Sequence, residues 1–333
     1  MTVSLRLDPE QPSREAIEWA AGIIQQGGLV AFPTETVYGV GADALNAAAV
    51  NRIFDAKGRP SDNPLIVHVA SRKMLDRLVA RVPEKAERLM ERFWPGPLTL
   101  VLERKADAAS AAAAGLPTLA VRMPQNKIAL ELIRTANTPI AAPSANISGR
   151  PSPTRAEHVV SDLSGRIDLI LDGGETRIGV ESTVLDLTTD PAVVLRPGWI
   201  TQEELAGVVG AVEAFATIRE LMRSPGTRHR HYSPRARVVI TETGNVAHIK
   251  ETCLGSLGAG AVGLICHTPI DIVHHQLRSV VLDNNAESYA RSIYDAMREL
   301  DSWGAQLIVI EAIAEEGAGT AVMDRIRRAA GEE

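Results

Sequence analysis

The sequence is poor in cysteine and has no excess of positive charge. Its 333 residues include only two cysteines, Cys253 and Cys266, and its formal net charge is −6. Two cysteines without a CxxC spacing exclude a disulfide framework and a zinc knuckle, so we expect reduced, buried thiols. The overall acidity excludes a general attraction to nucleic acid. Any anion site must therefore be a local concentration of cations.

Long hydrophobic runs and targeting segments are also missing. No apolar run approaches the roughly 20 residues that a membrane-spanning helix needs. The first residues, MTVSLRLDPEQPSREAI, lack a basic stretch followed by an apolar core, so no secretory signal is visible. There is no G-x-x-x-x-G-K-[ST] motif, which excludes nucleotide binding through a P-loop. With 45% hydrophobic and 23% charged residues, the composition predicts a globular, soluble, cytoplasmic protein.

Helix-like and strand-like segments alternate through the first 210 residues. Apolar residues recur at helical spacing over 14–26 and stop at Gly27-Gly28, which indicates the end of a helix. Several strand-like runs are continuously apolar, as expected for strands covered on both faces. The predicted strands cover 29–32, 65–69, 98–103, 118–123, 138–142, 168–172, 183–187 and 192–195. This pattern predicts an α/β or α+β domain whose strand order stays open.

The stretch 223–237, RSPGTRHRHYSPRAR, differs from everything before it. It has five arginines, two histidines, two prolines and no acid, and it lacks periodicity, which is typical of a linker. It could be a nucleic-acid arm, a solvated tether or a flap over an anionic ligand. Its aromatic residue, Tyr232, could stack on a base.

A second α/β pattern follows the linker. Strands are predicted at 237–242, 261–266, 279–283 and 306–312, and helices near 244–254, 286–303 and 319–330, which resembles a small doubly wound unit. Residues 258–263, GAGAVG, match the letters of a dinucleotide fingerprint. That fingerprint must follow a strand and open a helix, whereas this one precedes a strand. We do not expect it to bind a dinucleotide.

The stretch FDAKGRPSDNPLIVHVA, residues 54–70, places Lys57 and Arg59 on either side of a glycine. Prolines stiffen the turn, and the glycine lets backbone approach a ligand closely. Each cation would attract an anion 4 Å away by about 4 kcal/mol at an effective dielectric near 20. A phosphate site and an ordinary charged surface turn are both open from these residues. His68, in the strand that follows, has the default interpretation of a core histidine.

Small polar residues end two other predicted strands. In PIAAPSANISGRPSPT, residues 139–154, an apolar strand runs into Ser144 and Asn146, at the end where open α/β sheets bind ligands. A serine or asparagine turn explains them nearly as well. In LDGGETRIGVEST, residues 171–183, Ser182 is a candidate donor into a pocket, and a glycine-rich hairpin is the alternative.

Arg122 lies in the apolar run LAVRMP. An unpaired buried guanidinium is costly, so this side chain must face a partner or water. Its planar fork fits a carboxylate, which favours a ligand that carries one. A structural ion pair with a core Asp or Glu is the alternative.

Taken together, a series of motifs resembles the threonylcarbamoyl-AMP synthase family, the YrdC-type enzymes, in its long two-domain form. These motifs are PTETVYGVGADA, KGRPSDNPLIVHV, FWPGPLTLVL, VRMP, PIAAPSANISGRPSPT, DGGETRIGVEST, LRPG and HYSP. The resemblance implies a twisted mixed α/β YrdC-like catalytic domain over residues 1–210. It further implies a linker over 211–236 that reaches over the active site, and a small Rossmann-like α/β domain over 237–333.

The resemblance also implies a nucleotidyltransferase reaction. L-Threonine, bicarbonate or CO2, and ATP would give threonylcarbamoyl-AMP and pyrophosphate, with Mg2+ accompanying the ATP. A downstream threonylcarbamoyl-transferase complex would then modify adenosine 37 of tRNAs that read ANN codons. Because the substrate's own amine is the nucleophile, the protein's task is positioning and charge stabilisation, which needs cations and hydroxyls. The absence of a catalytic triad is therefore expected.

Site residues follow from the resemblance position by position. The polar cluster around the triphosphate and reacting groups would be Lys57, Arg59, Ser144 and Asn146. L-Threonine would be held by Thr34, His68, Arg122, Ser144 and Ser182, with Arg122 on its carboxylate. ATP would further contact Asn63, Thr118, Ala142, Ser152, Arg196 and Tyr232. No residue is assigned to a metal ion. His68 is a candidate general base only if a substrate amine proton lies within hydrogen-bond reach.

Two other functions compete with this one. A hydrogenase-type carbamoyl-adenylate maturation factor shares the YrdC-like domain, but its acylphosphatase-like module and paired CxxC motifs are missing here. A pure RNA-binding module could use the basic linker. The overall acidity argues against that module, although it leaves weak tRNA contact open.

Overall fold

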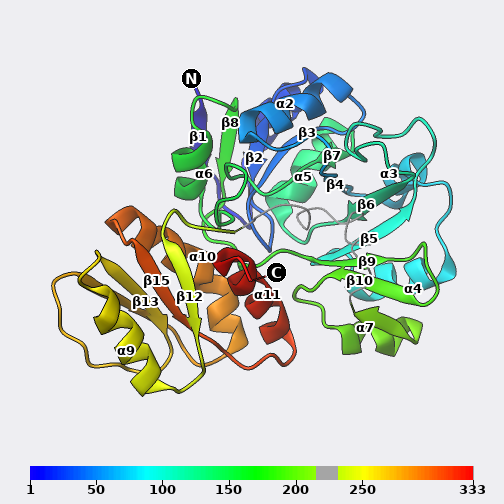
Figure 1. Cartoon of the computed structure of the whole chain (residues 1–333). Helices are drawn as coiled ribbons and strands as arrows, with labels where there is room; N and C mark the ends of the chain where they lie inside the picture. The colour runs from blue at the N-terminus through cyan, green and yellow to red at the C-terminus, as the bar shows by residue number, and fades with distance from the viewer. Residues whose placement is uncertain (215–231, 333) are drawn as a thin grey trace. The chain divides into compact units, whose positions relative to one another are not determined.

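The structure, a computed structural model, describes residues 1–214 and 232–332, and these form two compact units (Figure 1). Residues 1–148, 153–177 and 181–214 make up the first unit. The second contains residues 149–152, 178–180 and 232–332. Two short segments that precede residue 181 thus belong to the second unit. The predicted domain boundaries at 210 and 236 stay a prediction, because residues 215–231 lie outside the described part.

The first unit is built on an 11-stranded mixed sheet with the order β1-β8-β2-β3-β7-β4-β6-β5-β9-β10-β11. Its strands are β1 (Val3–Arg6), β2 (Val30–Phe32), β3 (Gly39–Asp43), β4 (Ile66–His68), β5 (Leu98–Glu103), β6 (Thr118–Arg122), β7 (Ile140–Ala141), β8 (Leu169–Asp172), β9 (Thr183–Asp186), β10 (Ala192–Arg196) and β11 (Val212–Ala214). Its helices are α1 (Arg14–Gln25), α2 (Ala47–Lys57), α3 (Arg72–Leu78), α4 (Glu84–Phe93), α5 (Lys127–Ala136), α6 (Ala156–Leu163) and α7 (Gln202–Val209). The central strands are short and buried, so their ends lie close to one another.

The register of β4 and β6 fixes the geometry of the region where the predicted site residues gather. These two strands are parallel, and His68 lies opposite Arg122 at their shared carboxyl ends. Strand β7 runs antiparallel to β4, so the segment after β7 returns to the start of β4, where the Ala142 amide donates to the Ile66 carbonyl over 2.9 Å. Since β4 has only three residues, its two ends are separated by about 7 Å.

The glycine between Lys57 and Arg59 has a structural role. Helix α2 begins at the Asn46 cap, whose side chain accepts from the Ala49 amide, and ends at Gly58 in the left-handed region with φ 60°. Glycine adopts this conformation without strain and commonly ends a helix by turning the chain away. Lys57 is therefore the last helical residue, not part of a free turn. The end of the helix is enough to explain why residue 58 is glycine, without a ligand close to its backbone.

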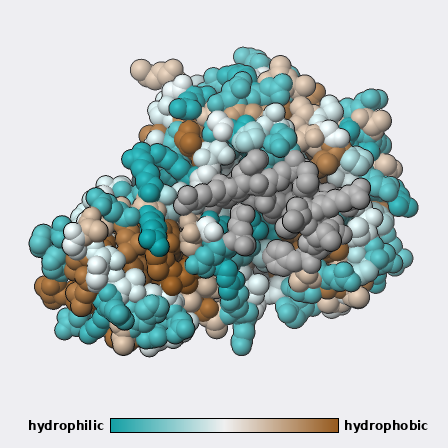
Figure 2. Space-filling model, in the orientation of Figure 1, coloured by the Kyte–Doolittle hydropathy of each residue, from teal (hydrophilic) through white to brown (hydrophobic). Residues whose placement is uncertain are grey.

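The second unit is a four-stranded parallel sheet with the order β12-β15-β13-β14. Its strands are β12 (Arg237–Thr241), β13 (Val262–Cys266), β14 (Leu277–Val281) and β15 (Leu307–Glu311). Its helices are α9 (Val246–Ser256), α10 (Ala286–Trp303) and α11 (Ala318–Ala330). Figure 1 shows α10 and α11 side by side, and the two helices pack together. In Figure 2, hydrophobic residues on this unit gather near the edge strand β12.

The fold class predicted from the sequence is confirmed: a mixed α/β unit precedes a small parallel α/β unit. Most predicted strands and helices are present within two residues of their expected bounds. Strands β1, β3 and β11 were not predicted, and β14 begins two residues before its predicted start. The GAGAVG stretch runs directly into β13, which confirms that it lacks the context of a dinucleotide fingerprint.

The two cysteines are free and buried, as predicted. Both lie in the apolar core of the second unit, and burial raises the pKa of each thiol to about 11. They are therefore protonated and unreactive at neutral pH. In the described part of the chain, no helix combines the length and hydrophobicity needed to cross a membrane.

A buried carboxylate joins three strand ends in the second unit. Glu311, at the end of β15, is fully buried. Its Oε1 accepts from the Gly244 amide (2.9 Å) and the Thr268 hydroxyl (2.7 Å), and its Oε2 accepts from the His267 and Thr268 amides (2.9 Å each). Burial raises the pKa of Glu311, but these hydrogen bonds outweigh burial and lower it overall. The carboxylate is therefore ionised at neutral pH and stabilises the folded unit.

We predict that Glu311→Gln lowers the free energy of unfolding by about 3 kcal/mol, because an amide nitrogen would face backbone donors in a buried site. Glu299→Gln is the control: Glu299 pairs with Arg278 on the surface and should cost less than about 1 kcal/mol. Urea unfolding at pH 7, followed by circular dichroism, measures both. Equal stability of the two variants would contradict the role of Glu311.

Candidate active site

Arg122 is buried in an ion pair with Glu35. Arg122 therefore has the kind of partner that the sequence leaves open as the alternative to a ligand's carboxylate. Its Nη2 lies 2.7 Å from Glu35 Oε1, and both side chains are 4% exposed. Its Nη1 donates to the Thr36 hydroxyl over 3.0 Å, and its Nε donates to the Gly96 carbonyl over 3.1 Å. A guanidinium has five N–H groups, so two remain beyond these three contacts with described residues. Those two can still hold a carboxylate.

The turn after β2 places two of the three partners of Arg122, Glu35 and Thr36. Thr34 donates its hydroxyl hydrogen to the Val37 carbonyl (2.7 Å), and its oxygen accepts from the Thr36 and Val37 amides (3.2 Å each). This side-chain turn is rigid and fixes Glu35 and Thr36 toward Arg122. Glu35 also accepts from the Gln125 amide over 3.0 Å. Thr34, predicted to bind L-threonine, therefore lies one hydroxyl contact away from Arg122, through Thr36.

His68 lies opposite Arg122 in the sheet and is buried beside the edge of Phe32. Burial and the positive charge of Arg122 lower the pKa of His68 to about 3. The imidazole is therefore neutral at physiological pH and is a poor proton acceptor. Its Nδ1 is buried and has no hydrogen-bond partner among the described residues. A buried nitrogen of this kind indicates a place for a ligand or a water molecule.

A second group surrounds Ser182, just before β9. Its hydroxyl lies 2.8 Å from the Thr99 hydroxyl and accepts from Arg196 Nη2 over 3.2 Å. Arg196 also donates to the Ser182 carbonyl through Nε (3.2 Å) and Nη2 (2.9 Å). Strand β5 lies between β6 and β9, so Thr99 and Ser182 lie near the Arg122 end of β6. Arg196, predicted for the nucleotide, is thus in contact with a residue predicted for L-threonine.

A third group is organised by Lys57. Its buried ammonium donates to the Ser144 carbonyl over 2.5 Å and to the Asn146 carbonyl over 2.6 Å. The Ser144 hydroxyl in turn donates to Asn146 Oδ1 over 2.6 Å. Lys57 therefore shapes the Ser144–Asn146 loop, a contact that sequence reasoning did not foresee. Its predicted contact with phosphate stays a prediction.

The remaining residues predicted for ATP are distributed over both units. Arg59 donates to the Pro64 carbonyl over 3.1 Å, near the start of β4, and Asn63 is buried in the same turn. Thr118 begins β6, and Ala142 follows β7. Ser152 and Tyr232 belong to the second unit. The rest of the linker prediction, residues 215–231, lies outside the described part of the chain.

The pairing of β4 with β6 and β7 thus places two sets of predicted residues at opposite ends of β4. Arg59, Thr118 and Ala142 lie at its starting end, whereas His68 and Arg122 lie at its carboxyl end. About 7 Å separates these two ends.

Sequence reasoning missed Glu35, Thr36 and Thr99. Glu35 is an acid within the apolar segment LVAFPTETVYG, just as Arg122 is a cation within LAVRMP. Burying either charge without a partner costs free energy, so an acid and a cation that both lie in apolar segments are candidates for an ion pair.

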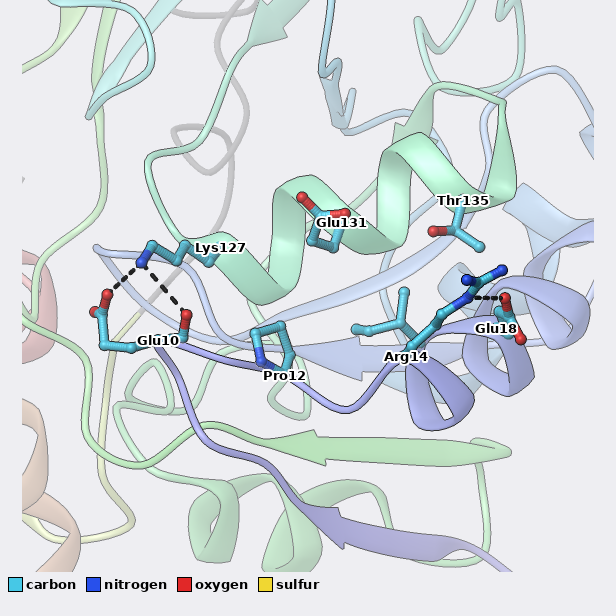
Figure 3. Close-up of a pocket in the computed structure, with 8 residues that line it drawn as sticks. Glu10, Pro12, Arg14, Glu18, Lys127, Glu131 and Thr135 are labelled. Carbon is cyan, nitrogen blue, oxygen red and sulfur yellow. Dashed lines mark hydrogen bonds and ion pairs between the residues drawn. The ribbon is translucent and has the colours of Figure 1, made fainter.

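An open pocket of about 590 Å3 between the start of α1 and helix α5 is a separate feature (Figure 3). None of the predicted site residues lines it. Its charged side chains are exposed and pair with one another: Lys127 lies 2.5 Å from Glu10, and Arg14 lies 2.7 Å from Glu18. This pocket therefore does not compete with the buried groups as the candidate site.

Family models match almost the whole chain. The Sua5/YciO/YrdC model, described as telomere recombination, matches residues 22–198, and the model of the threonylcarbamoyl-AMP synthase C-terminal domain matches residues 200–331. The threonylcarbamoyl-AMP synthase of Pyrococcus abyssi is 47% identical over 96% of both chains. This chain belongs to the threonylcarbamoyl-AMP synthase family. The family predicted from the motifs is confirmed.

Two further relatives support the same family. The Bacillus subtilis threonylcarbamoyl-AMP synthase is 46% identical over 95% of this chain and 93% of its own. The crystal structure of P. abyssi Sua5 complexed with L-threonine has a TM-score of 0.93 and 45% identity, and the match covers 100% of this chain and 98% of that one. The similarity to this family therefore extends over both units.

We predict that lowering the pH from 7 to 5 reduces the free energy of unfolding of the wild type more than that of His68→Asn. The difference between the two reductions should be about 2 kcal/mol. Below pH 6.5 the unfolded chain protonates His68, whereas the folded protein does not until about pH 3. The stability that His68 contributes is thus complete above pH 6.5 and is lost as the pH falls. Urea unfolding at both pH values measures the difference, and imidazole NMR at pH 5 should show a neutral ring. The same pH dependence in both proteins would disprove the lowered pKa.

Proposed function

We propose that this protein condenses L-threonine, CO2 from bicarbonate, and ATP into threonylcarbamoyl-AMP and pyrophosphate, as a nucleotidyltransferase. The observation that carries the proposal is the buried Arg122, which keeps two N–H groups beyond its contacts with described residues and lies opposite the neutral His68 in the sheet. Family membership supports the product, and the L-threonine complex of P. abyssi Sua5 supports the amino acid.

The chemistry needs no nucleophile from the protein. The amine of L-threonine attacks CO2 and loses a proton, which gives a carbamate. A carbamate oxygen then forms a bond to the α-phosphorus, and the bond from that phosphorus to the bridging oxygen breaks, so pyrophosphate leaves with the electron pair. The protein supplies orientation and stabilises the charge on phosphorus. No side chain is assigned as a general base, because the low pKa makes His68 unsuitable.

We assign the residues to two ends of the site. Arg122 would bind the carboxylate of L-threonine, with Thr34, His68, Ser144 and Ser182 around the rest of the amino acid. Lys57 would act by shaping the loop of Ser144 and Asn146 and by its charge beside the triphosphate. The other ATP contacts would be Arg59, Asn63, Thr118, Ala142, Ser152, Arg196 and Tyr232.

Mg2+ would enter with the nucleotide. Phosphate oxygens are strong ligands for Mg2+, and the ion commonly keeps several waters. No three His, Cys, Asp or Glu side chains in the described part are placed to hold a metal ion together, so its ligands would come mainly from ATP. The product would pass to a downstream threonylcarbamoyl-transferase complex for tRNA modification. Weak tRNA contact and a cytoplasmic location stay predictions from the sequence.

The function is tested by pyrophosphate release. We expect the purified protein to release pyrophosphate from ATP only when L-threonine and bicarbonate are both present. A carbamoyl-phosphate-dependent maturation factor would not require L-threonine, and an RNA-binding module would release none. Either result would overturn the proposal.

We predict that the double substitution Arg122→Ala/Glu35→Ala raises the KM for L-threonine by about 10- to 100-fold, because a charge-assisted contact with the carboxylate is lost. Removing both charges avoids leaving an unpaired buried ion. The KM for ATP should change little, and initial rates at varied L-threonine and ATP measure both constants. An unchanged KM for L-threonine would remove the carboxylate assignment.

A further inference from the structure

One face of helix α10 carries three residues at a spacing of four: Ala290, Tyr294 and Arg298. Residues four apart lie above one another on a helix, so these side chains form a single row. The backbone at Ala290 and the side chains of Tyr294 and Arg298 each touch a different segment of the second unit, and none of those segments is adjacent to α10 in the sequence. The row therefore contacts segments that are far apart from one another in the sequence.

The first segment is residues 178–180. A Cβ placed on Gly179 would lie 2.1 Å from the Ala290 carbonyl oxygen and 2.5 Å from Arg291 Cα. The backbone of this segment therefore lies directly against α10, and with φ +90° the position requires glycine. Two residues after Val180 comes Ser182, which we assign to L-threonine.

The second segment is the end of the linker. The Tyr232 ring stacks on Tyr294 with centroids 5.6 Å apart and an angle of 27°, and the fully buried Arg325 of α11 lies 5.3 Å from the same ring. Tyr232 has φ +64°, an uncommon backbone conformation for a residue with a side chain. These contacts hold Tyr232, which we assign to ATP, in a defined orientation.

The third segment is residues 149–152. Arg298 Nη2 donates to the Pro151 carbonyl over 2.5 Å. Ser233 joins this segment to the second, since its amide donates to the Gly149 carbonyl over 2.8 Å and its hydroxyl to the Ala329 carbonyl over 3.2 Å. The segment ends at Ser152, which is also assigned to ATP.

The peptide plane explains how Arg298 can act on Ser152. The carbonyl of Pro151 and the amide of Ser152 belong to one planar peptide unit, and in the trans form they point in opposite directions. Fixing the carbonyl on Arg298 therefore fixes the direction of the Ser152 N–H and the position of the Ser152 Cα. A charged donor makes a stronger hydrogen bond than a neutral one, which suits this function.

We propose that Arg298 is a positioning residue for ATP, acting through Pro151 on Ser152 within the second unit. This inference rests on the proposed function, which assigns Ser152 to ATP.

The test compares Arg298→Met with Arg298→Lys in the full-length protein. We expect Arg298→Met to raise the KM for ATP about tenfold, the loss of one charge-assisted hydrogen bond, with the KM for L-threonine and the melting temperature close to wild type. Arg298→Lys keeps a charged donor and should recover most of the ATP affinity. Arg278→Met is the matched control: Arg278 pairs with the surface Glu299 over 2.5 Å and should leave all constants unchanged.

Three results would overturn the proposal: a wild-type KM for ATP in Arg298→Met, a lysine variant no better than the methionine variant, or equal losses for both substrates with a lower melting temperature. If Arg298→Met does not fold, Arg298→Gln, which is too short to make the same contact, takes its place with the same expectations. Failure of the proposed function shows separately, as no pyrophosphate release by the wild type. The variants are then compared by calorimetric binding of ATP alone.

Discussion

The candidate site depends on the burial of one guanidinium at the end of a short strand. Arg122 cannot stay charged in an apolar sheet without compensation, and Glu35, Thr36 and the Gly96 carbonyl supply it. This requirement fixes the turn after β2 and the start of β5 against the end of β6. It also leaves part of the guanidinium for a ligand, and its positive charge helps to keep His68 neutral. The ion pair of Arg122 and Glu35 therefore stabilises the fold and also orients the guanidinium for the proposed contact with L-threonine.

Much of the fold could be predicted because the buried strands are nearly continuous runs of apolar residues. Strand β3 was missed because its sequence, GVGAD, is rich in glycine and small residues, which are depleted in strands. The exposed edge strand β1 and the three-residue β11 carry too little apolar pattern to be recognised. The stretch around Gly58 was expected to be a phosphate-binding turn or an ordinary charged surface turn, but Gly58 shows that the local sequence encodes the end of helix α2.

The motifs named candidate site residues, and their membership in the site stays a prediction, but the motifs could not give the contacts between these residues. Motifs identified Lys57, Arg122, Ser144 and Ser182, yet a linear pattern does not show which groups pair in space. Lys57 binds backbone carbonyls of the Ser144–Asn146 loop, and backbone acceptors leave no signature in a sequence. Two of the contacts of α10 were invisible for the same reason, because Gly179 and the Pro151 carbonyl contribute backbone to them and not side chains.

The hydrogen bonds of Glu311 have a consequence for what the second unit can do. Open parallel sheets of this type usually receive anionic ligands beyond the carboxyl ends of their strands, where loop amides point outward. Here the loop amides of Gly244, His267 and Thr268 converge on the protein's own carboxylate. The chain has thus placed an internal anion where a related sheet would take a phosphate, so this edge is already occupied.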